Sequence, residues 1–402
     1  MPARAPEIGA IMALFRKKQD PMERLKPQEL DETGILDMPY LVLTVLLVSI
    51  GVLMMFSASY AKAYYDTGNS AFYFVRQAMF AAGGILVTIV VGRLNYFIWY
   101  RLALPILAVS MVLLVMVLIP GVGVTHNGAT RWLKIGIEFQ PSEIAKLGLI
   151  LTFAAMMAVW QDKMNTFRYG VLPYAVILVM VAGLLVLEKH LSATLIIMLI
   201  GAILMLIGGT QKRWFLIGGV LVAVFLVIYL GSHGYANARI ATHRDPESDP
   251  LGSGYQIIQS RYAIGSGGLL GLGFGRSRQK YLYLPESHND YIFAIVCEEL
   301  GFVGAVGVML LFMLLILRGY WIAIHARDRF GTLVAAGFTT KLAIQVFFNI
   351  GVVTKFLPST GISLPFFSYG GTALLLQMFE MGVVLSVSRW CVNKRALRRK
   401  SA

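Results

Sequence analysis

The sequence predicts an all-α integral membrane protein of about ten transmembrane helices, with both termini in the cytoplasm and one large structured extracellular loop between helices 7 and 8. The 402 residues are 57% hydrophobic and only 14% charged, with a mean hydropathy of +0.70, which is far from the composition of soluble domains. Apolar runs of about 20 residues, long enough to cross the hydrocarbon layer as helices, recur from Pro39 almost to the C-terminus. Lysine and arginine are more frequent in the connections on one side of the membrane than in those on the other side.

Ten apolar runs define the expected membrane helices. Lipid offers the backbone no hydrogen-bond partners, so each run must satisfy its own backbone as a helix. The runs lie at 39–60, 72–92, 102–120, 141–160, 171–187, 191–208, 214–231, 291–317, 332–353 and 367–388. They form one membrane domain, 38–390, between an N-terminal cytoplasmic tail, 1–37, and a basic cytoplasmic tail, 391–402.

The distribution of lysine and arginine sets the orientation. If the N-terminus is cytoplasmic, 21 of the 35 basic residues lie in cytoplasmic segments and 12 lie in outer segments. This bias agrees with the positive-inside rule. The net charge of +14 is then explained by orientation and by contacts with membrane lipids, so nucleic acid is not an expected partner.

One outer connection, 231–290, is far longer than the others. Its stretch 255–264 carries apolar and polar residues at helical spacing, so we expect an interfacial helix and a structured loop. The glycine-rich stretch 265–275 that follows permits close backbone approach to a headgroup or to a neighbouring helix. No internal repeat of the kind that transporters carry is evident.

The first polar cluster runs from the outer loop Asn127-Gly-Ala-Thr-Arg-Trp-Leu-Lys134 into the fourth span. Glu143 and Lys146 are three residues apart and therefore share one helix face. They are either a self-neutralising pair that lets the helix enter lipid, or a cation for a phosphate with its orienting carboxylate. The spacing does not decide between these two hypotheses.

The second cluster, Leu284-Pro-Glu-Ser-His-Asn-Asp-Tyr-Ile-Phe293, precedes the eighth span. Asp290 lies where a polar loop meets an apolar helix, and a carboxylate partly removed from water there suits a general base. Helix N-capping is the structural alternative. Glu286 and His288 do not have metal-ligand spacing, although a carboxylate-rich loop can hold Mg²⁺. We expect at most one of the adjacent Glu298 and Glu299 to face a cavity.

The third cluster, 349–372, contains Pro358, Gly361 and Pro365, which forbid a regular helix. Broken backbone at a membrane surface is tolerated where it lines a cavity or packs against protein. We interpret this segment as the wall of a site. Tight helix packing is the alternative.

Together, the three clusters resemble the SEDS family (shape, elongation, division and sporulation) across residues 38–390. The string Pro358-x-x-Gly361, Leu364-Pro365, Ser368-Tyr-Gly-Gly371 is similar to the family signature. Within the family, Ser277-Arg-Gln-Lys280 followed by Tyr283-Leu-Pro-Glu286 is more similar to the division and sporulation branches than to the elongation branch. The chain departs from the family at Lys189-His-Leu-Ser192, where Pro-Asp-Leu-Gly is common.

The resemblance implies a peptidoglycan glycosyltransferase that polymerises lipid II at the outer face of the cytoplasmic membrane, at the division septum. Its implied partners are a class B penicillin-binding protein transpeptidase and other division proteins. It implies Asp290 as the catalytic residue and assigns roles to Trp132, Glu143 and Lys146.

Our mechanistic hypothesis makes Asp290 the base for the acceptor hydroxyl and undecaprenyl diphosphate the leaving group. A divalent cation, Mg²⁺ or Mn²⁺, is the one cofactor considered. A lipid II flippase, an elongation-type polymerase and a scaffold that only recruits the transpeptidase are the alternatives. The candidate substrate-binding residues are Lys146, Glu143, Trp132, Arg131, Arg261, Ser260, Glu286, His288 and Ser368.

Overall fold

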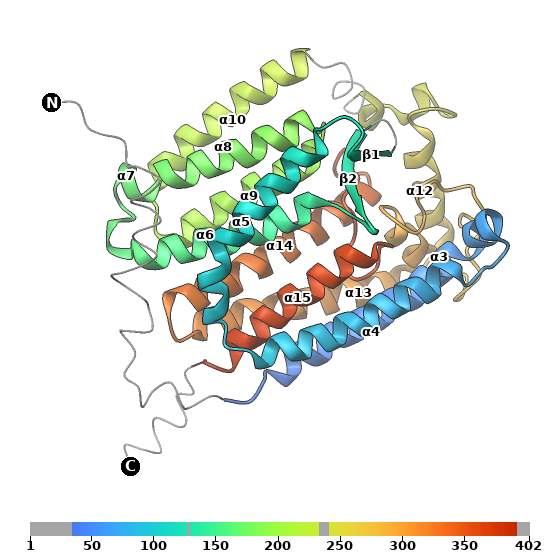
Figure 1. Ribbon diagram of the computed structural model, residues 1–402. Coiled ribbons are helices and arrows are strands. Elements are labelled where there is room, and N and C mark those ends of the chain that lie inside the picture. Colours follow the sequence, from blue (N-terminus) through green and yellow to red (C-terminus); the bar gives the residue numbers. More distant parts are fainter. Residues whose placement is uncertain (1–33, 127–128, 233–240, 392–402) are drawn as a thin grey trace.

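The computed structural model describes residues 34–126, 129–232 and 241–391 (Figure 1). All ten predicted apolar runs are helical. In the described part of the chain, nine helices are long and apolar enough to cross a membrane, with α7 and α8 together forming one of them. The seventh predicted run corresponds to α10. The helices of the membrane domain are α3 (Met38–Thr67), α4 (Phe72–Arg93), α5 (Phe97–Val117), α6 (Pro141–Val159), the four-residue α7 (Phe167–Gly170), α8 (Leu172–Leu187), α9 (Leu191–Gly208), α10 (Lys212–Ser232), α13 (Ile292–His325), α14 (Arg329–Val353) and α15 (Gly371–Ser388).

The two ends of the membrane domain meet at one end of the bundle. The amide of Gly34 donates to the Arg389 carbonyl at 2.7 Å, and the amide of Asp37 donates to the Ser388 hydroxyl at 3.1 Å. Arg318 of α13 also pairs there with Asp37, at 2.7 Å. We call this the inner end and the opposite one the outer end, following the charge bias of the sequence. Residues 1–33 and 392–402 of the two predicted tails lie outside the described residues.

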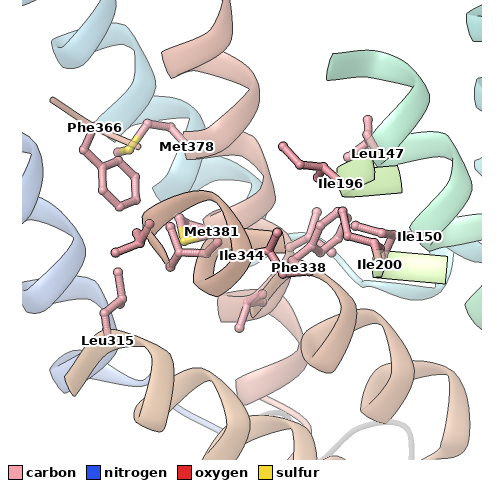
Figure 2. Packing of buried hydrophobic residues seen from close by; sticks show 14 of the residues in the cluster. Leu147, Ile150, Ile196, Ile200, Leu315, Phe338, Ile344, Phe366, Met378 and Met381 are labelled. Carbon is pink, nitrogen blue, oxygen red and sulfur yellow. The ribbon is translucent and has the colours of Figure 1, made fainter. Parts of the chain in front are cut away.

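In an apolar 18-residue stretch of each helix, 78% of the residues of α6 and of α14 are buried, against 28% of those of α4 and of α13. Helices α6 and α14 therefore form the centre of the bundle. Figure 2 shows Phe338 of α14 near Ile150 of α6 and Ile200 of α9. A Cβ atom at Gly337 would lie 2.5 Å from the Ile150 side chain, so glycine is required for this close approach. Close packing of this kind drives helix association in lipid, where helices gain no hydrophobic free energy from one another.

The outer end contains a small antiparallel sheet, which the all-α prediction did not include. It contains β1 (Gly123–His126), β2 (Ala129–Ile135) and β3 (Ile137–Phe139), in the order β1-β2-β3. We expected only a loop here, because the strands are short and lie between long apolar runs that dominate the pattern. The sheet leads directly into Pro141 at the start of α6.

The long outer connection contains the predicted helix, which is α12 (Tyr255–Gly267), preceded by the short helix η3 (Pro246–Ser248). The glycine-rich stretch after α12 packs on a neighbouring helix, which was one of its two predicted uses. A Cβ at Gly271 would lie 2.1 Å from the Glu299 carbonyl of α13, and Gly301 breaks that helix with a φ of 67°. Residues 233–240 of this connection lie outside the described part.

Candidate active site

Asp290 lies at the outer end, one residue before the cap of α13. The cap residue is Tyr291, so the hypothesis that Asp290 is the N-cap is wrong. The Asp290 side chain is half-buried, and its Oδ2 atom would lie 3.3 Å from a Cβ at Gly361. Gly361 has a φ of 67°, a conformation that other residues rarely adopt. Glycine at this position therefore allows the turn and leaves space beside the carboxylate.

Asn349 near the end of α14 and Ser368 in the broken segment between α14 and α15 hold the Asp290 loop in place. Asn349 donates from Nδ2 to the Asp290 carbonyl and to the Ile362 carbonyl, each at 2.7 Å. The Ser368 hydroxyl donates to the Asn289 carbonyl at 2.8 Å and accepts from the Leu364 amide at 2.7 Å. These bonds agree with the interpretation of the segment as a wall. They also give Ser368 a positioning contact, while its predicted role toward substrate stays a prediction.

His288 and Glu286 belong to the same loop. The His288 ring stacks on Tyr73 of α4 with centroids 5.5 Å apart, and burial lowers the pKa of this imidazole, so it is neutral at pH 7. Glu286 is exposed, and its Oε2 accepts from Asn289 Nδ2 at 2.6 Å. Glu286, His288 and Asp290 thus lie in one short loop, and Ser368 contacts this loop at the Asn289 carbonyl.

Glu143 and Lys146 form an ion pair that continues into the centre of the bundle. Glu143 Oε2 also lies 3.4 Å from Lys341 Nζ of α14, and Lys341 lies 2.6 Å from Glu380 Oε1 of α15. The four charges alternate in sign and sum to zero. Lys341 and Glu380 are fully buried, and the Glu143 side chain is 14% exposed. This geometry favours the self-neutralising hypothesis, and a contact of Lys146 with phosphate stays a prediction.

Glu298 and Glu299 bind the same outer segment, residues 275–280. The expectation that at most one of them faces a cavity stays a prediction. Glu299 accepts from the Ser277 amide and pairs with Lys280, both at 3.1 Å. Glu298 accepts from the Arg278 amide at 2.9 Å. A loop wrapped over the helix can reach both carboxylates, which helical spacing alone does not reveal. The lysine and amide donors of this loop explain why both carboxylates are buried.

The remaining candidates lie on other outer elements. Arg261 of α12 is exposed and pairs with Glu247 at 2.6 Å, and Ser260 of the same helix donates to the Val353 carbonyl at 2.9 Å. Arg131 and Trp132 lie half-buried on β2, and the Arg131 guanidinium donates to the Lys189 carbonyl. Their roles toward substrate stay predictions.

A metal centre was one possibility for the carboxylates of the outer loop. Within residues 34–126, 129–232 and 241–391, no group of three or more His, Cys, Asp and Glu side chains is arranged to hold a metal ion. The predicted divalent cation stays a prediction. Sequence reasoning missed Glu188, a buried carboxylate beside a pocket at the outer end. Its only signal was an acidic residue directly after an apolar run.

The chain was compared with known proteins. It is 40% identical over 354 residues to a probable peptidoglycan glycosyltransferase FtsW of Trichlorobacter lovleyi, covering 88% of this chain and 93% of that protein. It is 40% identical over 355 residues to stage V sporulation protein E of Bacillus subtilis, covering 88% and 97%. These alignments span nearly the full length of both relatives.

Solved structures share the fold. A chain from a peptidoglycan synthase complex, in which polymerization and crosslinking are coordinated, matches with a TM-score of 0.73 at 30% identity, covering 88% of this chain and 98% of that one. The rod shape determining protein RodA of Thermus thermophilus matches with a TM-score of 0.66 at 28% identity, covering 89% and 98%. The model of the FtsW/RodA/SpoVE family, described as cell cycle protein, matches residues 38–392. This multi-pass membrane protein therefore belongs to that family, which confirms the resemblance of its sequence motifs.

Proposed function

We propose that this protein is a peptidoglycan glycosyltransferase that polymerises lipid II at the outer face of the cytoplasmic membrane. The observation that carries the proposal is the half-buried Asp290 in a loop that Asn349 of α14 and Ser368 of the broken segment hold in place. Relatives named as peptidoglycan glycosyltransferases support it. A rigidly held carboxylate at the water–lipid border suits a base that must meet a lipid-anchored substrate.

In the proposed reaction, Asp290 takes a proton from the sugar hydroxyl of one lipid II molecule. That oxygen attacks the anomeric carbon of the growing strand, the bond to undecaprenyl diphosphate breaks, and the diphosphate leaves with its electron pair. Diphosphate is already a good leaving group, so no strong general acid is required. Arg131 and Arg261 are the cations proposed to stabilise the departing charge, and the buried Lys146, which is paired with Glu143, is the secondary candidate.

The flippase alternative predicts ionisable groups along a path through the membrane. Lys341 and Glu380, two ionisable groups within the membrane helices α14 and α15, are fully buried and pair with each other. Paired and packed charges of this kind do not line an open path. We therefore favour chemistry at the outer end.

The direct test is polymerisation of purified lipid II by the full-length protein together with a class B penicillin-binding protein, its proposed partner. We expect Asp290→Asn to fold and insert normally and to lose at least 100-fold in rate, since general base catalysis contributes roughly that much. Asp162→Asn, which makes the same change at an exposed aspartate between α6 and α7, is the matched control. Normal polymer from Asp290→Asn would refute the role of Asp290. Lipid II transport without polymer would favour a flippase, and neither activity would favour a scaffold.

The cellular role is proposed to be division, at the septum and with other division proteins. Sporulation and elongation are the alternatives within the family, because relatives are named for each. A fluorescent fusion at midcell in dividing cells is the expected result. A fusion spread along the lateral wall would favour elongation.

A further inference from the structure

A pocket of about 390 Å³ lies at the outer end of the bundle, where α5 and α8 end beside strands β1 and β2. Its volume falls in the range of small-molecule sites. The walls are apolar at Val117, Leu118 and Pro120, and the hydroxyl-bearing Thr130 and the carboxyl-bearing Glu188 supply polar groups. An amphipathic ligand at the membrane surface suits such a lining.

Glu188 is the unusual member of this pocket. It is only 3% exposed, and neither of its carboxylate oxygens has a hydrogen-bond partner among the described residues. The charge of Arg131 acts on Glu188, but the Arg131 guanidinium donates to the Lys189 carbonyl. Burial is the stronger effect and raises the pKa of Glu188 to about 8. A carboxyl group left in this state favours a ligand that donates hydrogen bonds to it.

The pocket adjoins the proposed active site through a short piece of chain. Two residues after Glu188, the Nε2 atom of His190 lies 3.5 Å from the Nε2 atom of Gln140. The Ser192 hydroxyl donates to the Thr360 carbonyl. Thr360 precedes Gly361, the residue that leaves space beside Asp290. A molecule bound at Glu188 therefore sits on the same outer face as the proposed chemistry.

We propose that this pocket binds a primary ammonium group, held by the Glu188 carboxylate, on a molecule at the outer membrane surface. An ammonium supplies three N–H donors, and its positive charge stabilises the ionised form of Glu188, which burial disfavours in the pocket without a cation. A sugar hydroxyl can also bond to the neutral carboxyl group, but it supplies no positive charge that would ionise it. The apolar wall at Val117 and Leu118 accepts the carbon chain that carries the amine.

Two sources carry this chemistry. One is an amine on the peptide of the lipid-linked precursor, and this source rests on the proposed function. The other is the ethanolamine headgroup of a membrane lipid, which does not depend on that function. Two measurements on the full-length protein distinguish these two sources. Each compares the wild type with Glu188→Gln, a substitution that keeps the side-chain shape and removes the ionisable group. Glu138→Gln, an exposed carboxylate on β3 outside the pocket, is the matched control.

The headgroup measurement compares thermal unfolding in nanodiscs of phosphatidylethanolamine with unfolding in nanodiscs of phosphatidylcholine, whose trimethylated amine has no N–H donors. If the headgroup is the ligand, the wild type and Glu138→Gln unfold several degrees higher in phosphatidylethanolamine, and Glu188→Gln shows no difference between the lipids.

The precursor measurement compares polymerisation of lipid II that carries a free peptide amine with polymerisation of the same lipid acetylated at that amine. If the peptide is the ligand, acetylation raises KM about tenfold for the wild type and for Glu138→Gln, and leaves KM of Glu188→Gln unchanged. A Glu188-dependent difference in either measurement supports the proposal, and its absence from both overturns it. A wild type that makes no polymer from either precursor would count against the proposed function, while the headgroup measurement would still decide the pocket.

Discussion

Lys341 Nζ lies 2.6 Å from Glu380 Oε1 in the interior of the membrane domain, where both side chains are fully buried. The same ammonium lies 3.4 Å from Glu143 Oε2, so one lysine neutralises carboxylates on two neighbouring helices, α6 and α15. Burying charges is costly unless each finds a counter-charge. Lys341 therefore links the outer pair Glu143–Lys146 to the centre of the bundle.

Replacing Lys341 by methionine leaves Glu380 buried without its counter-charge. We expect this single variant to lose about 3–5 kcal/mol of stability. The matched double variant, Lys341→Met with Glu380→Met, removes both charges of the pair and should recover most of that loss. Thermal or denaturant unfolding in detergent measures both. A double variant no more stable than the single one would contradict this account.

Gly361→Ala tests the space beside Asp290. Alanine at a φ of 67° costs about 1–2 kcal/mol, and its Cβ would lie 3.3 Å from the Asp290 carboxylate. We expect polymerisation to fall at least tenfold while the protein stays folded. Gly136→Ala is the control, because Gly136 has a φ of 75° and a Cβ there meets no atom within 4 Å. Equal activity loss in the two variants would show that backbone strain, and not crowding of Asp290, is responsible.

Stability should depend on pH through Glu188. Its pKa is about 8 in the folded protein and near its ordinary value of 4.5 in the unfolded chain. Between these values the unfolded chain has released a proton that the folded protein keeps, so stability falls as pH rises, by at most about 1.4 kcal/mol per pH unit. Unfolding of wild type and Glu188→Gln in phosphatidylcholine nanodiscs, measured from pH 5 to pH 8 in steps of about 1 pH unit, gives the slope. A variant with the wild-type slope would assign the effect to other groups.

A divalent cation should act with the substrate and not on the fold. Since no described group of three or more His, Cys, Asp and Glu side chains is arranged as a metal site, Mg²⁺ or Mn²⁺ would be held chiefly by the diphosphate. We expect chelation by EDTA to lower the polymerisation rate, excess Mg²⁺ to restore it, and the thermal unfolding midpoint to stay the same. A lower midpoint after chelation would indicate a structural metal site.

Several features of the site were predictable from local sequence. Pro358, Gly361 and Pro365 predict a broken segment because they forbid a helix, and the structure has that break between α14 and α15. Asp290 was singled out because it follows a polar loop and precedes an apolar run. The contacts that fix its loop, from Asn349 and Ser368, join residues more than 50 positions apart and have no local signal.

The sequence by itself determined the membrane domain, its helices and their charge bias, because a chain in lipid must satisfy its backbone within each apolar run. Only the tertiary structure decided which charges meet. The pairing of Lys341 with Glu143 and Glu380, the wrapping of one loop over Glu298 and Glu299, and the pocket at Glu188 all depend on how each helix is rotated and which neighbour it packs against. Those choices arise from side-chain packing between distant segments, which no single run of residues specifies.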